Sequence, residues 1–444
     1  MRIPVADAAR ATNARVVGDM SVVCAGVSYD SRSLAPGNLF VAVVAARDGH
    51  DFVGDAVRAG CSAVLVSREV PGCAVPQIVV PDTSTGLTEL GRWARGVLAP
   101  RVDGRVVGIT GSVGKTTTKD YVAAALRTKF SVGASEKSLN NDQGMPVTLL
   151  NAPDDAGALV LEMGMRGFGE IARLAALARP DIAVVTRVGE SHGERVGGVD
   201  GIARAKGELI EALAPTGIAV LNADDERVAA MRQLTDARVF TYGSADGADM
   251  RFSAVEQRGA EGVAFRFDSR WGNGGCVLTT PGLHMVSNAA AALLVAALTD
   301  CEPTAVAAAL GRSELSPMRM AIHRVGGLTI VDDSYNASPT SVMAALDTMA
   351  AMPARRRVAV LGEMAEIADA DAMHRAVTAH ATSLGIEVVA VGTDLYGVRR
   401  IDDREEVAAF VKALPTDSVA LFKASRVVGL DRIVRLLLGR SIGA

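Results

Sequence analysis

The stretch Arg105-Val-Val-Gly-Ile-Thr-Gly-Ser-Val-Gly-Lys-Thr-Thr-Thr118 decides the fold. Its apolar first half predicts a short buried strand, and the residues after it carry apolar side chains at helical spacing. Between the two, small residues allow backbone N–H groups to wrap a phosphate at a helix N-terminus. Lys115 would contact the outer phosphates, and a Thr hydroxyl would bind a magnesium ion. A nucleoside triphosphate site is therefore predicted over the alternative of a glycine turn, although Ile109 stands where the general motif has glycine.

Length and composition indicate a soluble α/β protein of several domains. The 444 residues exceed what one hydrophobic core supports, and aromatic residues make up only 4% of the chain. The net charge of −4 gives no basis for binding nucleic acid or an anionic membrane. The most apolar run, Ala289–Leu298, is far shorter than the roughly 20 residues that cross a bilayer, and residues 1–17 lack a secretory core. Five scattered cysteines without C-x-x-C pairs predict reduced thiols. We expect a cytoplasmic monomer.

Apolar runs separated by helical patterns divide the chain into three expected domains. Residues 1–83 predict a small α/β N-terminal domain, and residues 84–313 a central parallel-sheet domain around the phosphate loop. Residues 314–444 predict a C-terminal domain of Rossmann type, without the G-x-G-x-x-G that would indicate a dinucleotide. Ligands of parallel sheets bind beyond the carboxyl ends of the strands. Polar residues at those ends are therefore the candidates for a site.

Two such residues belong to the expected central sheet. Glu162 ends the apolar run that starts at Ala158, and His192 lies in the loop after Ile182–Thr186. A carboxylate at this edge suits Mg²⁺, held directly or through water. The alternatives are an ordinary exposed carboxylate and a loop histidine without a role. Their shared edge with the phosphate loop favours the functional interpretation.

Lys206 is the most informative single residue. Ile202, Leu209, Ile210 and Leu213 mark one face of a predicted helix, and Lys206 falls inside that apolar stripe. Burying a free ammonium is costly unless it is paired. Either the side chain snorkels with its stem on the core, or it is held near a phosphate or cation and is chemically modified. Spacing alone leaves both interpretations open.

Three polar clusters in the last third of the chain follow or precede apolar runs. Pro281–Asn288 precedes an Ala-rich helix, where Asn288 could be a simple N-cap. Asp332–Pro339 follows a strand and holds more polar groups than a turn requires. Lys423-Ala-Ser-Arg426 ends the last strong strand with two cations, which suits an anionic substrate group; a solvated helix start is the alternative.

Taken together, these motifs resemble the Mur ligase family over nearly the whole chain. The resemblance favours the branch that adds D-alanyl-D-alanine, through the D-D-S-Y-N and L-G-E-M-x-E stretches and the absence of D-N-P-R. The matching motifs are Asp30-Ser-Arg32, Thr110–Thr117, Leu139–Gly144, Leu161–Gly167, Gly189-Glu-Ser-His192, Ala205–Glu208, Leu221–Asp225, Pro281–His284 with Asn288, Arg319, Asp332–Asn336, Leu361–Glu366 and Lys423–Arg426.

The resemblance implies an ATP- and Mg²⁺-dependent ligase. ATP would phosphorylate a peptide carboxylate, and an amine would attack the acyl phosphate, here joining D-Ala-D-Ala to UDP-MurNAc-tripeptide in peptidoglycan precursor synthesis. Implied catalytic residues are Lys115, Glu162, His192 and Lys206, the last as a carbamylated lysine, and implied metal ligands are Thr116, Glu162, His192 and Lys206. Implied ATP contacts are Thr110, Gly111, Ser112, Val113, Gly114, Lys115, Thr116, Thr117, Asn288, Arg319 and Asp333. Implied substrate contacts are Ser31, Arg32 and His50 at the UDP end, Asn140 and Asn141 near the reaction centre, and Tyr335, Asn336, Lys423 and Arg426 for the incoming amine.

One departure concerns the nucleotide-sugar side. The family has Gly-Glu-Arg-Phe before Asp-Gly-His in its first domain, whereas this chain reads Val44-Ala-Ala-Arg-Asp-Gly-His50. A related ligase acting on another carboxylate and amine is therefore the second hypothesis. A nucleotide-binding scaffold without activity is the third, but the presence of Lys115, Glu162, His192 and Lys206 together argues against it.

Overall fold

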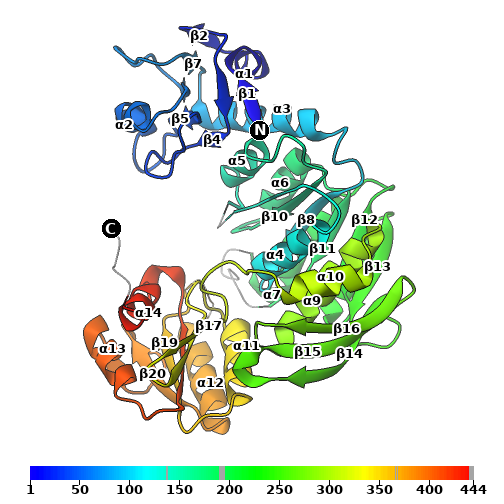
Figure 1. Cartoon of the computed structure of the whole chain (residues 1–444), viewed down its shortest axis with the longest axis vertical. Coiled ribbons are helices and arrows are strands. Elements are labelled where there is room, and N and C mark those ends of the chain that lie inside the picture. The colour runs from blue at the N-terminus through cyan, green and yellow to red at the C-terminus, as the bar shows by residue number, and fades with distance from the viewer. Residues whose placement is uncertain (137–138, 190–195, 366, 368, 440–444) are drawn as a thin grey trace.

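The computed structural model describes residues 1–136, 139–189, 196–365, 367 and 369–439. His192, expected in the site, lies outside the described residues. The chain forms three units, each built on a sheet of its own (Figure 1). The expected domain boundaries at 83/84 and 313/314 stay predictions; nearby, α3 begins at Thr83 and α10 ends at Gly311.

The first unit is a small α/β layer, blue in Figure 1. Its five-stranded sheet has the order β2-β7-β6-β5-β4, in which β4 to β7 pair in parallel and β2 pairs antiparallel. A separate ribbon pairs β1 with β3. The strands are β1 (Arg2–Pro4), β2 (Arg15–Val17), β3 (Val23–Ala25), β4 (Val27–Ser28), β5 (Leu39–Val41), β6 (Ala63–Val66) and β7 (Gln77–Val79); the helices are α1 (Val5–Thr12), η1 (Gly49–Phe52), α2 (Val53–Arg58) and α3 (Thr83–Leu98).

The central unit holds a nine-stranded sheet of order β16-β15-β14-β13-β12-β11-β8-β10-β9. Strands β8 to β14 pair in parallel, as the alternation of strands and helices predicts. The antiparallel pairs β14–β15 and β15–β16 extend this sheet and were not predicted. The strands are β8 (Val106–Thr110), β9 (Val132–Ala134), β10 (Ala158–Glu162), β11 (Ile182–Val185), β12 (Ile218–Asn222), β13 (Arg238–Gly243), β14 (Met250–Gln257), β15 (Val263–Ser269) and β16 (Gly272–Leu278). The helices are α4 (Lys115–Leu126), α5 (Gly144–Leu150), α6 (Glu170–Ala178), α7 (Gly198–Glu211), α8 (Glu226–Ala230), η3 (Met231–Leu234), η4 (Gly259–Glu261), α9 (Leu283–Leu298) and α10 (Pro303–Gly311).

The C-terminal unit is a second, mostly parallel sheet of order β17-β18-β22-β19-β20-β21, with only the edge strand β17 antiparallel. This arrangement fits the expected Rossmann type. The strands are β17 (Ala321–Val325), β18 (Leu328–Asp332), β19 (Arg357–Gly362), β20 (Glu387–Val391), β21 (Arg400–Ile401) and β22 (Val419–Lys423); the helices are α11 (Pro339–Ala350), α12 (Ala370–Ser383), α13 (Arg404–Lys412), η5 (Arg426–Val428) and α14 (Asp431–Leu437).

Two hydrophobic cores cross the unit boundaries. Alternate residues of β8 point to opposite faces of the central sheet, so Val107 packs with α4 and α9 while Val106 packs with α3, α5, α6 and α7. The core around Val107 continues into the C-terminal unit under α11, and the core around Val106 continues into the first unit. The central sheet is therefore anchored to both neighbours by buried apolar contacts.

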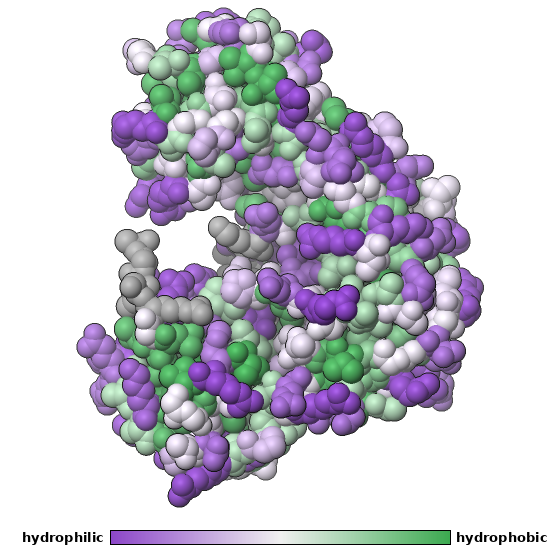
Figure 2. All heavy atoms as spheres, in the orientation of Figure 1, coloured by the Kyte–Doolittle hydropathy of each residue, from purple (hydrophilic) through white to green (hydrophobic). Residues whose placement is uncertain are grey.

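The first and C-terminal units flank a hollow on one side of the central unit (Figures 1 and 2). Hydrophilic side chains are prominent on the surface around the hollow in Figure 2. Strand β8 and the N-terminus of α4 lie in the central unit, between the two flanking units (Figure 1). Across the described residues, no helix is long and apolar enough to cross a membrane.

Candidate active site

The phosphate loop requires glycine at two positions. Gly111 has φ +149°, and a Cβ there would lie 1.9 Å from Thr186 Oγ1. Gly114 has φ +85°, and a Cβ there would lie 2.6 Å from Asn288 Oδ1. Both the backbone conformation and the available space exclude a larger residue. The loop thus has the small residues and the helix start that phosphate binding needs.

Hydrogen bonds from neighbouring strand ends hold the loop in shape. Ser112 N–H donates to Arg187 O at 2.7 Å, and Ser112 Oγ donates to Gly189 O at 2.8 Å. Thr186 Oγ1 donates to Val113 O at 2.6 Å, and Thr110 Oγ1 donates to Met163 O at 2.9 Å. The loop is therefore fixed by residues that follow β10 and β11. Thr117, also expected at the nucleotide, is buried in the first turn of α4.

The Lys115 ammonium folds back over its own loop. It donates to Gly111 O at 2.7 Å and to Ser112 O at 3.2 Å. Burial lowers the pKa of Lys115; the Glu162 carboxylate opposes that shift, and the Arg319 guanidinium adds to it. An anion at the loop would offer this ammonium a charged acceptor in place of two neutral carbonyls.

Thr116 stands at the centre of a network of expected residues. Its hydroxyl donates to Glu162 Oε2 at 2.7 Å and accepts from an Arg319 guanidinium nitrogen at 2.9 Å. Asn140 Nδ2 donates to the other carboxylate oxygen, Glu162 Oε1, at 2.8 Å. Four residues that are far apart in the sequence thus meet at the loop. Asn141, in contrast, caps α5 by accepting from Gly144 N–H at 2.8 Å.

Lys206 lies on the buried face of α7, with a relative exposure of 2%. Burial lowers its pKa well below the usual value, and the nearby positive charge of Lys115 lowers it further. This arrangement favours an uncharged amine, which is the form that can be chemically modified.

The described residues do not assemble a ready-made metal site. No group of three or more His, Cys, Asp or Glu side chains placed to hold a metal occurs in the ranges that the structure describes. Close to the loop lie three basic side chains, Lys115, Lys206 and Arg319, and the single carboxylate of Glu162. With these positive charges beside one carboxylate, a further negative group would strengthen the binding of a divalent cation there.

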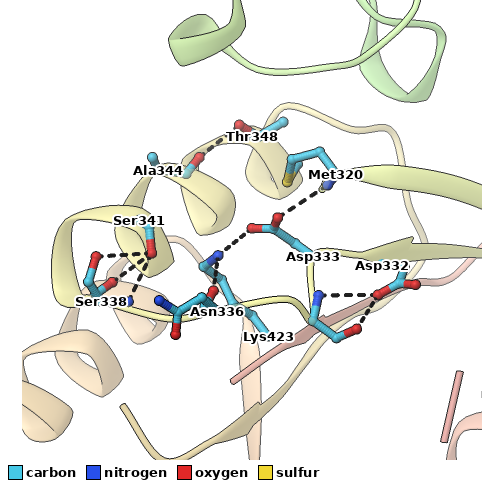
Figure 3. A network of polar contacts seen from close by, with 10 residues as sticks. Met320, Asp332, Asp333, Asn336, Ser338, Ser341, Ala344, Thr348 and Lys423 are labelled. Carbon is cyan, nitrogen blue, oxygen red and sulfur yellow. Dashed lines mark hydrogen bonds and ion pairs between the residues drawn. The ribbon is translucent and has the colours of Figure 1, made fainter. Parts of the chain in front are cut away.

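The C-terminal unit contributes a buried ion pair. Lys423, which ends β22, pairs with Asp333 and also donates to Asn336 O at 2.9 Å (Figure 3). The other Asp333 oxygen accepts from Met320 N–H at 3.2 Å. Lys423, which was expected at the incoming amine, thereby contacts Asp333, which was expected at ATP, and Asn336, which was expected at the amine. The sequence did not predict this pairing.

Other expected residues lie around this pair. The ring of Tyr335 lies 4.4 Å from the Arg319 guanidinium carbon, so this aromatic residue faces the phosphate-loop side. Arg426 pairs with Asp431 at 2.9 Å. Asn288 lies behind the loop, where its Oδ1 accepts from Thr118 Oγ1 at 3.2 Å.

Ser31, Arg32 and His50 lie in the first unit. Arg32 forms a bidentate pair with Asp30, and Ser31 stands between them in the chain. His50 Nδ1 donates to an Asp48 oxygen at 2.6 Å, since its Nε2 accepts from a backbone N–H of the next strand end. These three residues are not in contact with the phosphate loop.

Two residues near the site were given no role from the sequence: Asp120 was not considered, and His284 was quoted only within the Pro281–His284 motif. Asp120, on α4, accepts from Ser316 N–H at 2.8 Å and pairs with Lys119. His284 lies beside the Asp333–Lys423 pair, and burial lowers its pKa to about 4. The signal for Asp120 was present in the sequence, since Lys119-Asp120 places two charges in the turn of the helix that follows the phosphate loop.

The chain belongs to the Mur ligase family. Residues 109–296 match the Mur ligase middle domain, and residues 318–428 match the Mur ligase glutamate ligase domain. Among curated relatives, the UDP-N-acetylmuramoyl-tripeptide–D-alanyl-D-alanine ligase of Escherichia coli is 34% identical over 93% of both chains. The ligase of the same name from Mycobacterium tuberculosis is 39% identical over 83% of this chain and 77% of its own length.

Solved structures of MurF, the short name of that ligase, share the whole fold. MurF from Acinetobacter baumannii superposes with a TM-score of 0.87 at 26% identity, covering 99% of both chains. MurF from Thermotoga maritima in complex with ADP superposes with a TM-score of 0.78 at 28% identity, covering 93% of this chain and 96% of its own. The expected family and three-domain α/β fold are thereby confirmed.

Proposed function

We propose that this ligase adds D-alanyl-D-alanine to UDP-MurNAc-tripeptide at the expense of ATP. The single observation that carries the proposal is the meeting of Lys115, Thr116, Glu162, Asn140 and Arg319 at one loop. Relatives named for this reaction align with more than nine-tenths of the chain, which supports the same substrates here. A cytoplasmic, monomeric enzyme is part of the proposal; the small, soluble substrates support the cytoplasmic location.

The chemistry would proceed in two steps. A carboxylate oxygen of the tripeptide attacks the γ-phosphorus of ATP, the bond to the β-phosphate oxygen breaks, and ADP leaves. The dipeptide amine then attacks the acyl carbon, phosphate leaves with the former carboxylate oxygen, the amine loses a proton, and an amide remains. Lys115 and the loop N–H groups would hold the transferred phosphoryl group, and Arg319 would add charge beside it. Asn140 would orient the acid near Glu162.

Mg²⁺ would be held by Thr116, Glu162, His192 and a modified Lys206. The residues described at the site fit this role once Lys206 is carbamylated, since a carbamate supplies the negative charge that they lack. The neutral amine of Lys206 attacks the carbon of CO₂, a proton is released, and an anion replaces the ammonium. When bound, the cation neutralises phosphate charge.

Residues 44–48 favour a second candidate function, in which the ligase acts on a different carboxylic acid. They form a tight turn in which Val44 bridges Asp48 and Ala45 N–H donates to Arg47 O at 3.0 Å. This turn replaces the longer family motif on the nucleotide-sugar side. A related ligase that activates a different carboxylate is therefore the second candidate.

A coupled ADP-release assay decides between the candidates. Turnover is expected with UDP-MurNAc-tripeptide and D-Ala-D-Ala together, and background release with either one alone. If that pair is inert while another acid and amine release ADP, the first candidate is refuted and the second is supported. Replacing Lys206 with Ala in the same assay controls for contaminating ATPases.

A further inference from the structure

The linker between the central and C-terminal units is held at both ends. It comprises residues 312–320, between the end of α10 and the start of β17. On the central side, Ser316 N–H donates to Asp120 Oδ2 at 2.8 Å, and Arg319 donates to Thr116 Oγ1 at 2.9 Å. Thr116 and Asp120 are four residues apart on α4, so both contacts lie on one face of the phosphate-loop helix.

The C-terminal side holds the same linker through the loop after β18. Tyr335 N–H donates to Met318 O at 3.3 Å, and Met320 N–H donates to Asp333 Oδ1 at 3.2 Å (Figure 3). Lys423 fixes Asp333 from the other side. The residues on both sides of Arg319 are therefore tied to the C-terminal unit.

The linker backbone is strained where it carries Arg319. Met318 has φ +62° and Met320 has φ +52°, both in the left-handed region that non-glycine residues rarely adopt. Such conformations persist only where the surrounding contacts enforce them. The Nε of Arg319 is buried and has no hydrogen-bond partner among the described residues. The strain thus places a partly unsatisfied guanidinium against Thr116.

We propose that Asp120 is a positioning residue that braces this linker. By holding Ser316, it keeps Arg319 at Thr116 and keeps Asp333 and Lys423 turned toward the phosphate loop. Asp120 acts through Arg319 and makes no contact with the reacting groups. The catalytic consequence of the brace rests on the proposed function, whereas the brace itself can be measured without substrates.

Limited trypsin digestion of the full chain measures the brace directly. Cleavage after Arg319 produces a fragment that begins at Met320, which mass spectrometry identifies. Losing a hydrogen bond to a charged acceptor raises local opening about tenfold or more. Asp120→Ala is therefore expected to speed cleavage at this bond at least about tenfold, with other sites cut at the wild-type rate. A wild-type rate at this bond, or equal acceleration at every site, overturns the proposal.

The Lys119 pair provides the matched control. Asp120→Ala also leaves the buried Lys119 without its carboxylate, although Lys119 still donates to Ser135 O at 2.9 Å. Lys119→Met keeps Asp120 and should be cut after Arg319 at the wild-type rate. The double variant K119M/D120A removes the unpaired charge and should remain as fast as D120A. Recovery in the double variant would assign the effect to charge and refute the brace.

The kinetic arm uses the coupled assay. If Asp120 braces the linker, D120A should lower kcat about tenfold or more, because the reacting groups are less well aligned with the phosphate loop. The KM of D-Ala-D-Ala should change less than about threefold, because the expected dipeptide contacts all belong to the C-terminal unit and stay together there. An unchanged kcat in a variant that trypsin shows to be open overturns the positioning role. If the wild-type chain is inert with this substrate pair, the proposed function fails, and the digestion still decides whether the brace exists.

Discussion

Replacing Gly111 with Ala is expected to raise the Kd for ATP strongly without unfolding the chain. The new Cβ would lie 1.9 Å from Thr186 Oγ1, so Thr186 must rotate away. That rotation breaks the hydrogen bond that the Thr186 hydroxyl shares between Val113 O at 2.6 Å and Thr110 O at 3.2 Å. The phosphate loop would keep its Ser112 bonds to Arg187 and Gly189 but lose the Thr186 contact, and its shape would change.

The magnitude follows from two costs. Holding alanine at φ +149° costs about 1–3 kcal/mol, and losing the hydrogen bond of the Thr186 hydroxyl, whose one proton is shared by two carbonyl oxygens, costs about 1 kcal/mol. Together they amount to at least about 2 kcal/mol, which corresponds to an ATP Kd raised about 30-fold or more. Thr186→Ala already forfeits that hydrogen bond. The double variant G111A/T186A should therefore be less impaired than the sum of the single variants, by about 1 kcal/mol.

Isothermal titration of the full chain with ATP measures both effects. Gly104 provides a matched control, since it has φ +71° but nothing within 4 Å of an added Cβ. G104A should bind ATP with the wild-type Kd. If G111A binds ATP within about fivefold of wild type, or if the two variants are strictly additive, the loop geometry described above is wrong.

Three further changes test the charges around the loop and the adjoining pair. Lys206→Ala should lower kcat about 100-fold or more. Removing bicarbonate should reversibly inactivate the wild-type enzyme, and activity that does not depend on bicarbonate would contradict the carbamylation of Lys206. Lys423→Met leaves Asp333 buried without its cation and should lower the free energy of unfolding, measured in urea, by about 3–5 kcal/mol. Part of this loss should be recovered in D333N/K423M, and strictly additive effects of the two substitutions would contradict the ion pair. The lowered pKa of His284, about 4, means that the unfolded chain binds more protons below pH 6.5. The contribution of His284 to the free energy of unfolding is therefore fully present above pH 6.5 and is lost as the pH falls toward 4, by up to about 2.5 kcal/mol at pH 4.5. His284→Gln should remove this part of the acid destabilisation. A pH profile of unfolding that is unchanged in this variant would contradict the assignment to His284.

The fold was largely predictable because its signals are local. The phosphate loop and the apolar strands that end at Thr110 and Glu162 follow from a few adjacent residues each. The antiparallel strands between Met250 and Leu278 escaped prediction, since they carry charged residues and glycines on one exposed face. Their place in the sheet depends on pairing with β13, which the sequence pattern does not encode.

The site was predictable where its residues follow neighbouring strands of the parallel sheet. Glu162 and Thr116 were expected together, and they share a hydrogen bond. The pairing of Asp333 with Lys423 joins residues 90 positions apart, and the family resemblance implied an ATP contact for one and an amine contact for the other. The Asp120–Ser316 bond spans 196 positions and depends on a linker that has no motif of its own. Such contacts are set by how whole units pack.

The most direct test of the central claim follows oxygen from the acid into phosphate. UDP-MurNAc-tripeptide labelled with ¹⁸O in its reacting carboxylate is incubated with ATP, D-Ala-D-Ala and the enzyme, and the inorganic phosphate is analysed by mass spectrometry. The acyl-phosphate route predicts one ¹⁸O in each phosphate released and one retained in the new amide. Phosphate free of ¹⁸O, alongside amide formation, would contradict it.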